Sequence, residues 1–124
     1  MRDIKFRAWD TINKVWIDVF ELKIGQSGEV MAIAALDGEL YGLHQVKLVQ
    51  FTGLCDKEGV EIYEGDILHG ERTLGIRHRV GYTTGKFICY SRHGFPEAGI
   101  YHFSKKCIVI GNIYENLELL RNRK

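Results

Sequence analysis

The sequence predicts a mainly β protein, with short antiparallel strands in coiled or barrel-like sheets and one short helical turn near the carboxyl terminus. Apolar and polar residues alternate from the first segment onward, which is the period of a half-buried strand. The chain contains 14 glycines and one proline, a composition that favours many tight turns. No strand-like segment alternates with a long helical one, which argues against a parallel α/β fold.

The amino-terminal region is expected to form a hairpin followed by a third strand. Residues 4–8 alternate apolar with basic side chains, and residues 15–20 are rich in β-branched and aromatic types. Residues 10–14 between them are turn formers. Another strand is expected at residues 30–36, between two glycine-containing turns.

The middle of the chain contains the clearest strand pattern, at residues 46–52. Residues 56–59 follow as a turn, because aspartate bonds its own backbone and glycine accepts a positive φ. A return strand is expected at 60–63, and a bend at 64–66 separates it from a short strand at 67–68.

The carboxy-terminal half is expected to contain strands at residues 76–82, 86–90 and 107–110. Residues 91–99 include Gly94, Pro96 and Gly99 and are expected to form a loop. Residues 114–120 are expected to form the helical turn, with Asn116 as its cap.

The length of 124 residues fits a single domain covering residues 1–124. An alternative is two intertwined subdomains with a weak boundary near residues 65–73, where the charge changes sign. Residues 1–69 carry 7 basic and 12 acidic side chains, whereas residues 70–124 carry 10 basic and 4 acidic ones. The net charge of +1 makes no case for nucleic-acid binding by the whole chain, although the second half could support it.

Cysteine usage and hydropathy indicate the cytoplasm. Cys55, Cys89 and Cys107 are odd in number, widely spaced and without a CxxC pair, which suits a reducing compartment. No apolar run approaches the roughly 20 residues of a membrane span. The first residues alternate charged with apolar side chains, so no secretion signal and no membrane partner are expected.

Three carboxylates around the bend at 64–66 could converge as an acid–base pair or a hard-metal site: Glu61, Glu64 and Asp66. Acidic residues at turns more often face solvent or cap the backbone. His93 with Cys89 is a conceivable metal pair, but their spacing does not aim both at one point. No nucleophile motif or phosphate-binding loop is present in the sequence. We therefore predict no catalytic residue, no cofactor and no metal.

A basic and aromatic stretch is the strongest candidate surface. It consists of Arg72, Arg77, Arg79, Tyr82, Lys86, Tyr90 and Arg92. Arg77 and Arg79 are two apart and hence on one strand face, opposite Ile76, His78 and Val80. This surface could contact another protomer through arginine–carboxylate pairs, or it could follow a phosphate backbone while tyrosines stack on bases. The first interpretation is favoured.

Three stretches resemble the YopX family of phage and prophage proteins. They are Met1–Asp10, residues 49–67 with the sequence QFTGLCDKEG followed by EIYEGDI, and residues 110–120 beginning IGNIYEN. The resemblance implies strongly bent, coiled sheets with SH3-like barrel character, a homo-oligomer, and a phage or prophage gene expressed inside a bacterial host. It implies no activity and no catalytic residues.

The expected function is that of a non-enzymatic accessory protein that self-associates and presents a surface to a macromolecule, either a phage or a host protein. The alternative is a small β-barrel that binds nucleic acid through residues 72–92. Salt-dependent retention of DNA or RNA would distinguish the two.

Overall fold

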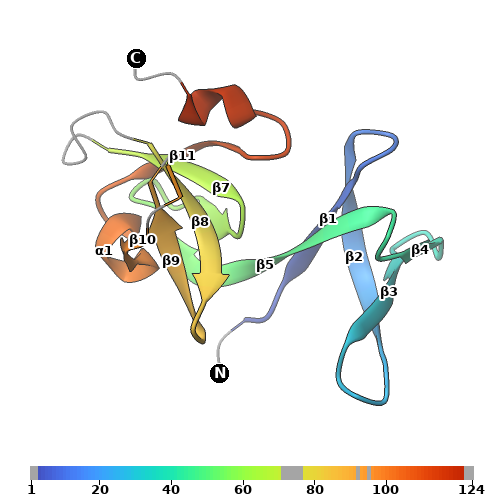
Figure 1. Cartoon of the computed structure of the whole chain (residues 1–124). Coiled ribbons are helices and arrows are strands. Elements are labelled where there is room, and N and C mark those ends of the chain that lie inside the picture. Colours follow the sequence, from blue (N-terminus) through green and yellow to red (C-terminus); the bar gives the residue numbers. More distant parts are fainter. Residues whose placement is uncertain (1–2, 71–76, 92, 95, 122–124) are drawn as a thin grey trace. The chain divides into compact units, whose positions relative to one another are not determined.

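The strands form two antiparallel sheets in the computed structural model, which describes residues 3–70, 77–91, 93–94 and 96–121 (Figure 1). One sheet has the strand order β4-β3-β2-β1-β5-β6, and the other has the order β10-β9-β8-β7-β11. In the described residues each order runs from one edge strand to another without closing. The predicted mainly β, antiparallel fold is confirmed.

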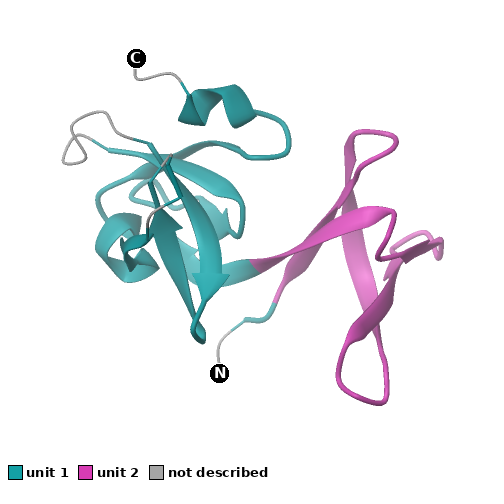
Figure 2. Cartoon of the chain, in the orientation of Figure 1, with its two compact units in different colours: residues 1–4, 51–124 teal, residues 5–50 magenta. Residues whose placement is uncertain are grey.

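Contacts divide the chain into two units, residues 5–50 and residues 1–4 with 51–124 (Figure 2). The division falls inside β5 (Val46–Cys55), which pairs with β1 through its first half and with β6 through its second. This division lies elsewhere than the weak boundary expected near residues 65–73, of which residues 71–73 are outside the described residues. Residues 66–69 form a strand that pairs on both sides within the larger unit, so the change of charge there does not coincide with a loss of contacts.

The unit of residues 5–50 is a twisted sheet built on the predicted hairpin. Its elements are β1 (Phe6–Asp10), β2 (Val15–Ile24), β3 (Val30–Ala35), β4 (Leu40–Gly42) and the first half of β5. Alternate residues of these strands form one buried cluster, namely Ala8, Ile17, Ile33, Ala35 and Val46. The two-residue period thus places one face of each strand inside.

Asp10 explains the hairpin turn between β1 and β2. Its Oδ1 accepts the backbone N–H groups of Ile12 and Asn13 at 2.9 and 3.0 Å, and its Oδ2 accepts Nδ2 of Asn13 at 2.9 Å. Lys14 completes the turn with a φ of 58°. These bonds hold the pKa of Asp10 below its usual value, the backbone bond from Asn13 having the largest effect.

The unit of residues 1–4 and 51–124 contains the remaining elements. They are β6 (Glu61–Tyr63), β7 (Asp66–His69), β8 (His78–Thr83), β9 (Lys86–Tyr90), β10 (Pro96–Gly99), α1 (Ile100–Ser104), β11 (Ile108–Asn112) and the 3₁₀ helix η2 (Leu117–Leu120). Their shared core consists of Ile62, Leu68, Val80, Cys89, Ile100 and Cys107.

Two parts of this unit differ from the sequence prediction. The expected loop at 91–99 ends in β10, which pairs with β9 at the edge of the sheet and begins with Pro96, a position where proline is tolerated. The helix α1 follows directly and buries Ile100 and Ser104. It is too short to show a helical period in the sequence. The predicted turn η2 is confirmed, but Asn116 makes no side-chain capping bond to it.

No helix in the described ranges is both long and apolar enough to cross a bilayer.

Candidate functional site

The hairpin of β8 and β9 carries most of the predicted basic and aromatic surface. Arg79 lies directly across from Tyr90, and its guanidinium carbon is 4.2 Å from the centre of the tyrosine ring. Thr83 lies across from the exposed Lys86. Because residues two apart share a strand face, Arg79, Lys86 and Tyr90 belong to one face of the hairpin.

Two other described members of the predicted surface make their contacts elsewhere. Tyr82 alternates to the opposite face, where its ring meets Phe87 edge-on at 5.0 Å. Arg77 precedes β8 and donates from Nη1 to the carbonyl of Leu119 at 3.1 Å, which ties it to η2. Arg72 and Arg92 lie outside the described residues. Of the five predicted residues that lie within the described ranges, three share this face.

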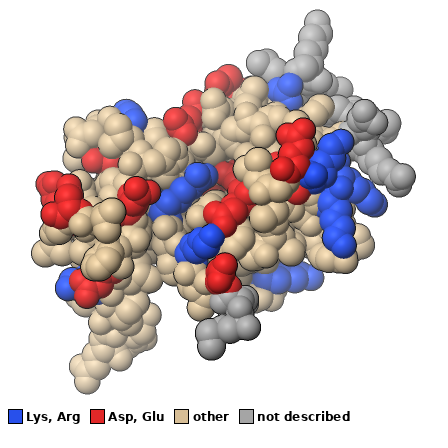
Figure 3. Space-filling model, turned by 180° about the vertical axis from the view of Figure 1, so that it is seen from behind, with Lys and Arg blue, Asp and Glu red and all other residues tan. Residues whose placement is uncertain are grey.

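On one face of the molecule, charges of both signs are interspersed. On the face shown in Figure 3, Lys and Arg side chains stand among Asp and Glu side chains. Such a surface differs from the basic stripe that proteins use to track a nucleic-acid backbone.

The three carboxylates considered for catalysis or metal binding do not form one group. Asp66 is 2% exposed, and its Oδ2 accepts the backbone N–H of Tyr63 at 2.8 Å, which closes the bend before β7. Within the described ranges, no three His, Cys, Asp or Glu residues lie close enough to hold a metal ion. Asp66 therefore stabilises the turn.

The buried thiols are chemically quiet. Burial raises the pKa of Cys89 to about 12, and burial also raises the pKa of Cys107. Both stay protonated at neutral pH and are poor nucleophiles. Cys89 is fully buried whereas His93 is exposed, so this pair does not converge. His78 is also buried, as its place in the strand pattern predicted, and its ring lies 4.8 Å from that of Phe103.

Two of the sequence stretches noted above meet at the junction of β7 and β11. Asp66 of β7 is the register partner of Asn112 of β11. The Oδ1 of Asn112 accepts the backbone N–H groups of Tyr114 and Glu115 at 3.0 and 2.9 Å. Next to this pair, the carbonyl of Gly65 accepts the N–H of Ile113 at 2.8 Å. The stretches EGDI and GNIYE thus connect β7 to β11.

Exposed apolar side chains are concentrated in the unit of residues 5–50, a feature that the local sequence pattern does not predict. Eight large apolar residues there are exposed: Ile12, Val15, Phe20, Ile24, Met31, Leu36, Leu40 and Leu43. Phe20 and Leu36 are 70% and 72% exposed. Phe20 stands at a bulge, because the β2–β3 register shifts between Val19 and Glu21.

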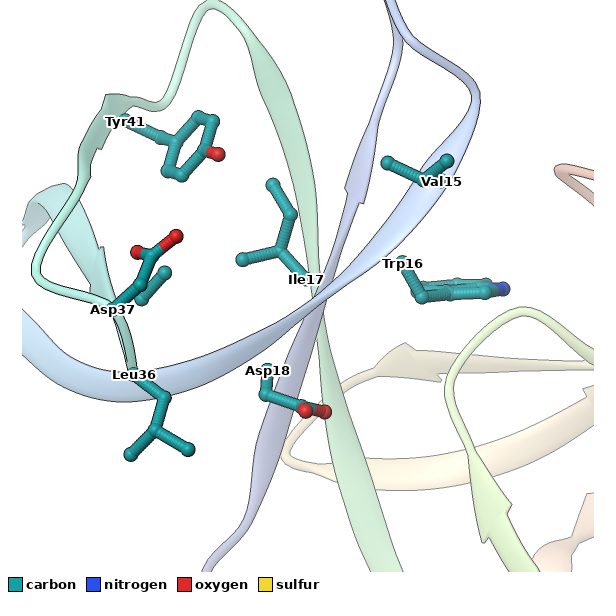
Figure 4. A pocket seen from close by; sticks show the side chains of 8 residues that line it. Val15, Trp16, Ile17, Asp18, Leu36, Asp37 and Tyr41 are labelled. Carbon is teal, nitrogen blue, oxygen red and sulfur yellow. The ribbon is translucent and has the colours of Figure 1, made fainter.

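A groove opens on the same unit, with a volume of about 540 Å³ (Figure 4). Its lining residues are Val15, Trp16, Ile17, Asp18, Ala35, Leu36, Asp37 and Tyr41. In Figure 4 the Asp37 carboxylate and the Tyr41 hydroxyl point toward the space beside Ile17, while Trp16 extends from the other side of β2. The groove could not be predicted from the sequence, because β2, β3, β4 and the turn between the last two form it jointly.

Partial burial raises the pKa of Tyr41, and the carboxylates of Glu39, Asp37 and Asp10 add to that increase. A phenolate in this position would be repelled by three negative charges. The groove is consequently an electronegative environment with apolar walls.

Comparisons with known proteins point to one family and one similar fold. The family model described as YopX protein matches residues 5–121. A solved structure, that of protein EF1440 from Enterococcus faecalis, is 27% identical and has a TM-score of 0.69, with 97% of this chain and 99% of that chain covered. The search of curated proteins finds no match.

Proposed function

The chain belongs to the YopX family, and on that premise we propose that it is a phage or prophage accessory protein that acts by binding rather than by catalysis. In this proposal the protein self-associates through the unit of residues 5–50 and presents a surface to a macromolecular partner. The cytoplasm of a bacterial host is the proposed location, in keeping with the three free cysteines.

The observation that supports self-association is the exposure of eight large apolar side chains on a unit of only 46 residues, 5–50. Burying one such side chain away from water favours association by roughly 1.5–3 kcal/mol. Exposed apolar side chains that gather in one patch typically mark a protein contact. The edge strand β4, which carries the exposed Leu40, offers a further place for pairing.

Binding rather than catalysis is supported by the state of the candidate reactive groups. The Cys89 and Cys107 thiols are buried with raised pKa values, and Asp66 is engaged in a turn. The side chains of Asp66 and Asn112, in the EGDI and GNIYE stretches, likewise accept backbone N–H groups that close turns.

Native mass measurement of the purified protein tests self-association directly. The wild type should form an oligomer at micromolar concentration, and a Phe20→Ser, Leu40→Ser variant should shift toward the monomer by at least about tenfold in dissociation constant. Val60→Ser is the matched control, because Val60 is exposed but lies in the other unit. A wild-type protein that is monomeric at these concentrations would reject self-association.

A second candidate function, nucleic-acid binding, is favoured by one observation. Arg79, Lys86 and Tyr90 lie on one face of the β8–β9 hairpin, and the guanidinium of Arg79 stacks on the ring of Tyr90. A phosphate could contact the two cations from that face. Adding an oligonucleotide to the same native mass experiment addresses this candidate.

A further inference from the structure

Arg79 and Tyr90 lie opposite each other in the β8–β9 hairpin, and the tyrosine ring supports the guanidinium. The two residues are register partners, and the guanidinium carbon is 4.2 Å from the centre of the ring. Both side chains are partly buried. Cation–π attraction at this distance opposes free rotation of the long arginine side chain. The ring therefore favours one position of the guanidinium on this face of the hairpin.

Gly81 makes room for the stacked pair. It is buried, and it follows Arg79 by two residues on the same face of β8. A Cβ at this position would lie 2.6 Å from Cε2 of Tyr90 and 3.1 Å from Nη1 of Arg79. Gly81 has no positive φ, so the backbone itself does not require a glycine. A side chain at position 81 would thus push the tyrosine ring away from its place under the guanidinium.

The stack covers the plane of the guanidinium and leaves its N–H edge for a ligand. A guanidinium has five N–H donors in one plane, arranged as a fork that matches two oxygens of a phosphate or a carboxylate. Within the described residues, the Arg79 guanidinium contacts the Tyr90 ring, and no carboxylate pairs with it. Arg77, in contrast, donates to the carbonyl of Leu119. Arg79 is therefore the better placed of the two to bind an oxyanion.

The same contacts change the role expected of Tyr90. The sequence suggests that tyrosines of this surface could stack on bases. In the structure, the Arg79 guanidinium lies over the ring of Tyr90, and the Cδ2–Cε2 edge of the ring lies against Gly81. A base stacking on that side of the ring would have to displace the guanidinium. Tyr90 is thus a positioning residue, and the contact with the ligand falls to Arg79.

Lys86 supplies a second cation on this face, at a separation that suits a repeating anion. It lies across from Thr83, which is four positions after Arg79 along β8, or about 13 Å at the rise of an antiparallel strand. A nucleic-acid strand carries a phosphate about every 3.4 Å along its helix axis, so both cations can reach one whatever the base sequence. Carboxylates of a protein partner recur at no fixed spacing. The two cations therefore fit a phosphodiester backbone better than an acidic protein.

We propose that the β8–β9 face binds the phosphodiester backbone of a nucleic-acid strand without reading its bases, through an Arg79 guanidinium that Tyr90 and Gly81 hold in position. Arg79 and Lys86 contact phosphate oxygens, whereas Tyr90 acts through Arg79. The inference rests on the second candidate function, nucleic-acid binding, and it specifies the chemical group that is recognised.

The test titrates the full-length protein, at low ionic strength, into two fluorescein-labelled probes. One is a thymidine dodecamer, and the other is a dodecamer of abasic sites with the same phosphodiester backbone. A base stacked on a tyrosine would favour the thymidine probe by at least about fivefold. Fluorescence anisotropy should instead give affinities that agree within about threefold. Tyr90→Leu should bind both probes about two- to fivefold more weakly, and Tyr90→Phe, which keeps the ring, should bind like the wild type.

Two glycine variants test the support of the ring. Gly81→Ala should reproduce the loss of affinity for both probes, because its Cβ displaces the tyrosine. Gly99→Ala is the matched control, since a Cβ there meets nothing within 4 Å and the φ of Gly99 is −63°. If the stack served only the stability of the hairpin, Tyr90→Leu and Gly81→Ala would lower the melting temperature and leave both affinities unchanged. That result would overturn the proposal.

A double-mutant cycle shows whether Tyr90 acts through Arg79. In a protein that already carries Arg79→Ala, the change Tyr90→Leu should cause no further loss of affinity. Additive losses would show that Tyr90 contacts the nucleic acid itself, and the proposal would be wrong.

The two probes also separate this inference from the function on which it rests. If the wild type binds the thymidine probe but binds the abasic probe at least about fivefold more weakly, nucleic-acid binding holds and this inference fails. If the wild type binds neither probe, both fail. A labelled dodecamer of glutamate is the third probe. Its binding through Arg79, without binding of either oligonucleotide, would identify an acidic protein as the partner and reject the proposal.

Discussion

The carboxylate of Asp56 accepts the backbone N–H of Val109 through Oδ2 at 2.9 Å, across 53 positions of sequence. The other oxygen of Asp56 accepts the N–H groups of Glu58 and Val60 at 2.8 and 2.9 Å. One side chain thus shapes the turn after β5 and fastens it to β11. Asp56 is 6% exposed, so little solvent competes for these bonds.

We predict that Asp56→Ala lowers the free energy of unfolding by about 2–4 kcal/mol, because three N–H groups lose a charged acceptor. The variant Asp56→Asn should lose less stability, since its amide oxygen can still accept some of the three N–H groups. Urea unfolding followed by circular dichroism measures both. An alanine variant as stable as the wild type would contradict the structural role of this bond set.

Gly65→Ala should lower the free energy of unfolding by more than Gly85→Ala. Both glycines have positive φ, 87° and 81°, which costs an alanine roughly 1–2 kcal/mol. A Cβ at Gly65 would also lie 2.9 Å from Cε2 of Tyr114, whereas a Cβ at Gly85 meets nothing within 4 Å. Urea unfolding of the two variants measures the difference, and equal losses would show that the Tyr114 contact is unimportant.

Local pattern predicted most of the strands because each depends on nearby residues. The two-residue alternation at residues 4–8 and 15–20 corresponds to β1 and β2, which pair antiparallel with Ala8 opposite Ile17. β4 and α1 were not predicted, because their three and five residues are too few to display the period of a strand or a helix. Their formation depends on pairing with β3 and packing on the core.

The candidate surface shows the same limit. Sequence parity places Arg79 and Tyr82 on opposite faces of a strand, so their separation was predictable from their numbers. The bond from Arg77 to Leu119 joins residues 42 apart and has no local signal. The groove depends on the register of β2 against β3, including a bulge at Phe20, which composition does not reveal.

Stability should fall as the pH rises above 9. Burial raises the pKa of Cys89 from 9.0 to about 12 in the folded protein, so between these values only the unfolded chain loses the proton. The free energy of unfolding should then decrease by up to about 1.4 kcal/mol per pH unit from this thiol. Cys89→Ala should flatten the decrease in urea unfolding between pH 9 and 11. An unchanged slope in this variant would assign the effect to other groups.

Stability should also fall in acid through Asp10. Its pKa is lowered in the folded state by the bonds from Asn13 and Ile12, so its contribution is present above the unfolded value near 3.8 and disappears as the pH drops through the folded value. Asp10→Asn should be less stable than the wild type at pH 7, and the difference should shrink below pH 4. Thermal unfolding from pH 7 to pH 2.5 measures this, with Asp18→Asn as an exposed control. A difference that is constant with pH would contradict the assignment.

Nucleic-acid binding, if it occurs, should depend on the β8–β9 face. Arg79→Ala and Lys86→Ala should each weaken binding of a labelled single-stranded oligonucleotide and reduce the magnitude of the salt slope by about one phosphate contact. Arg79→Lys keeps the charge but loses the planar stack on Tyr90, so its loss should be smaller. Lys47→Ala is the control, because Lys47 is exposed in the other unit, on the first half of β5. Anisotropy titrations at low salt measure the affinities. No binding by the wild type would eliminate this function. An equal loss of affinity in Lys47→Ala would show that binding does not depend on the β8–β9 face.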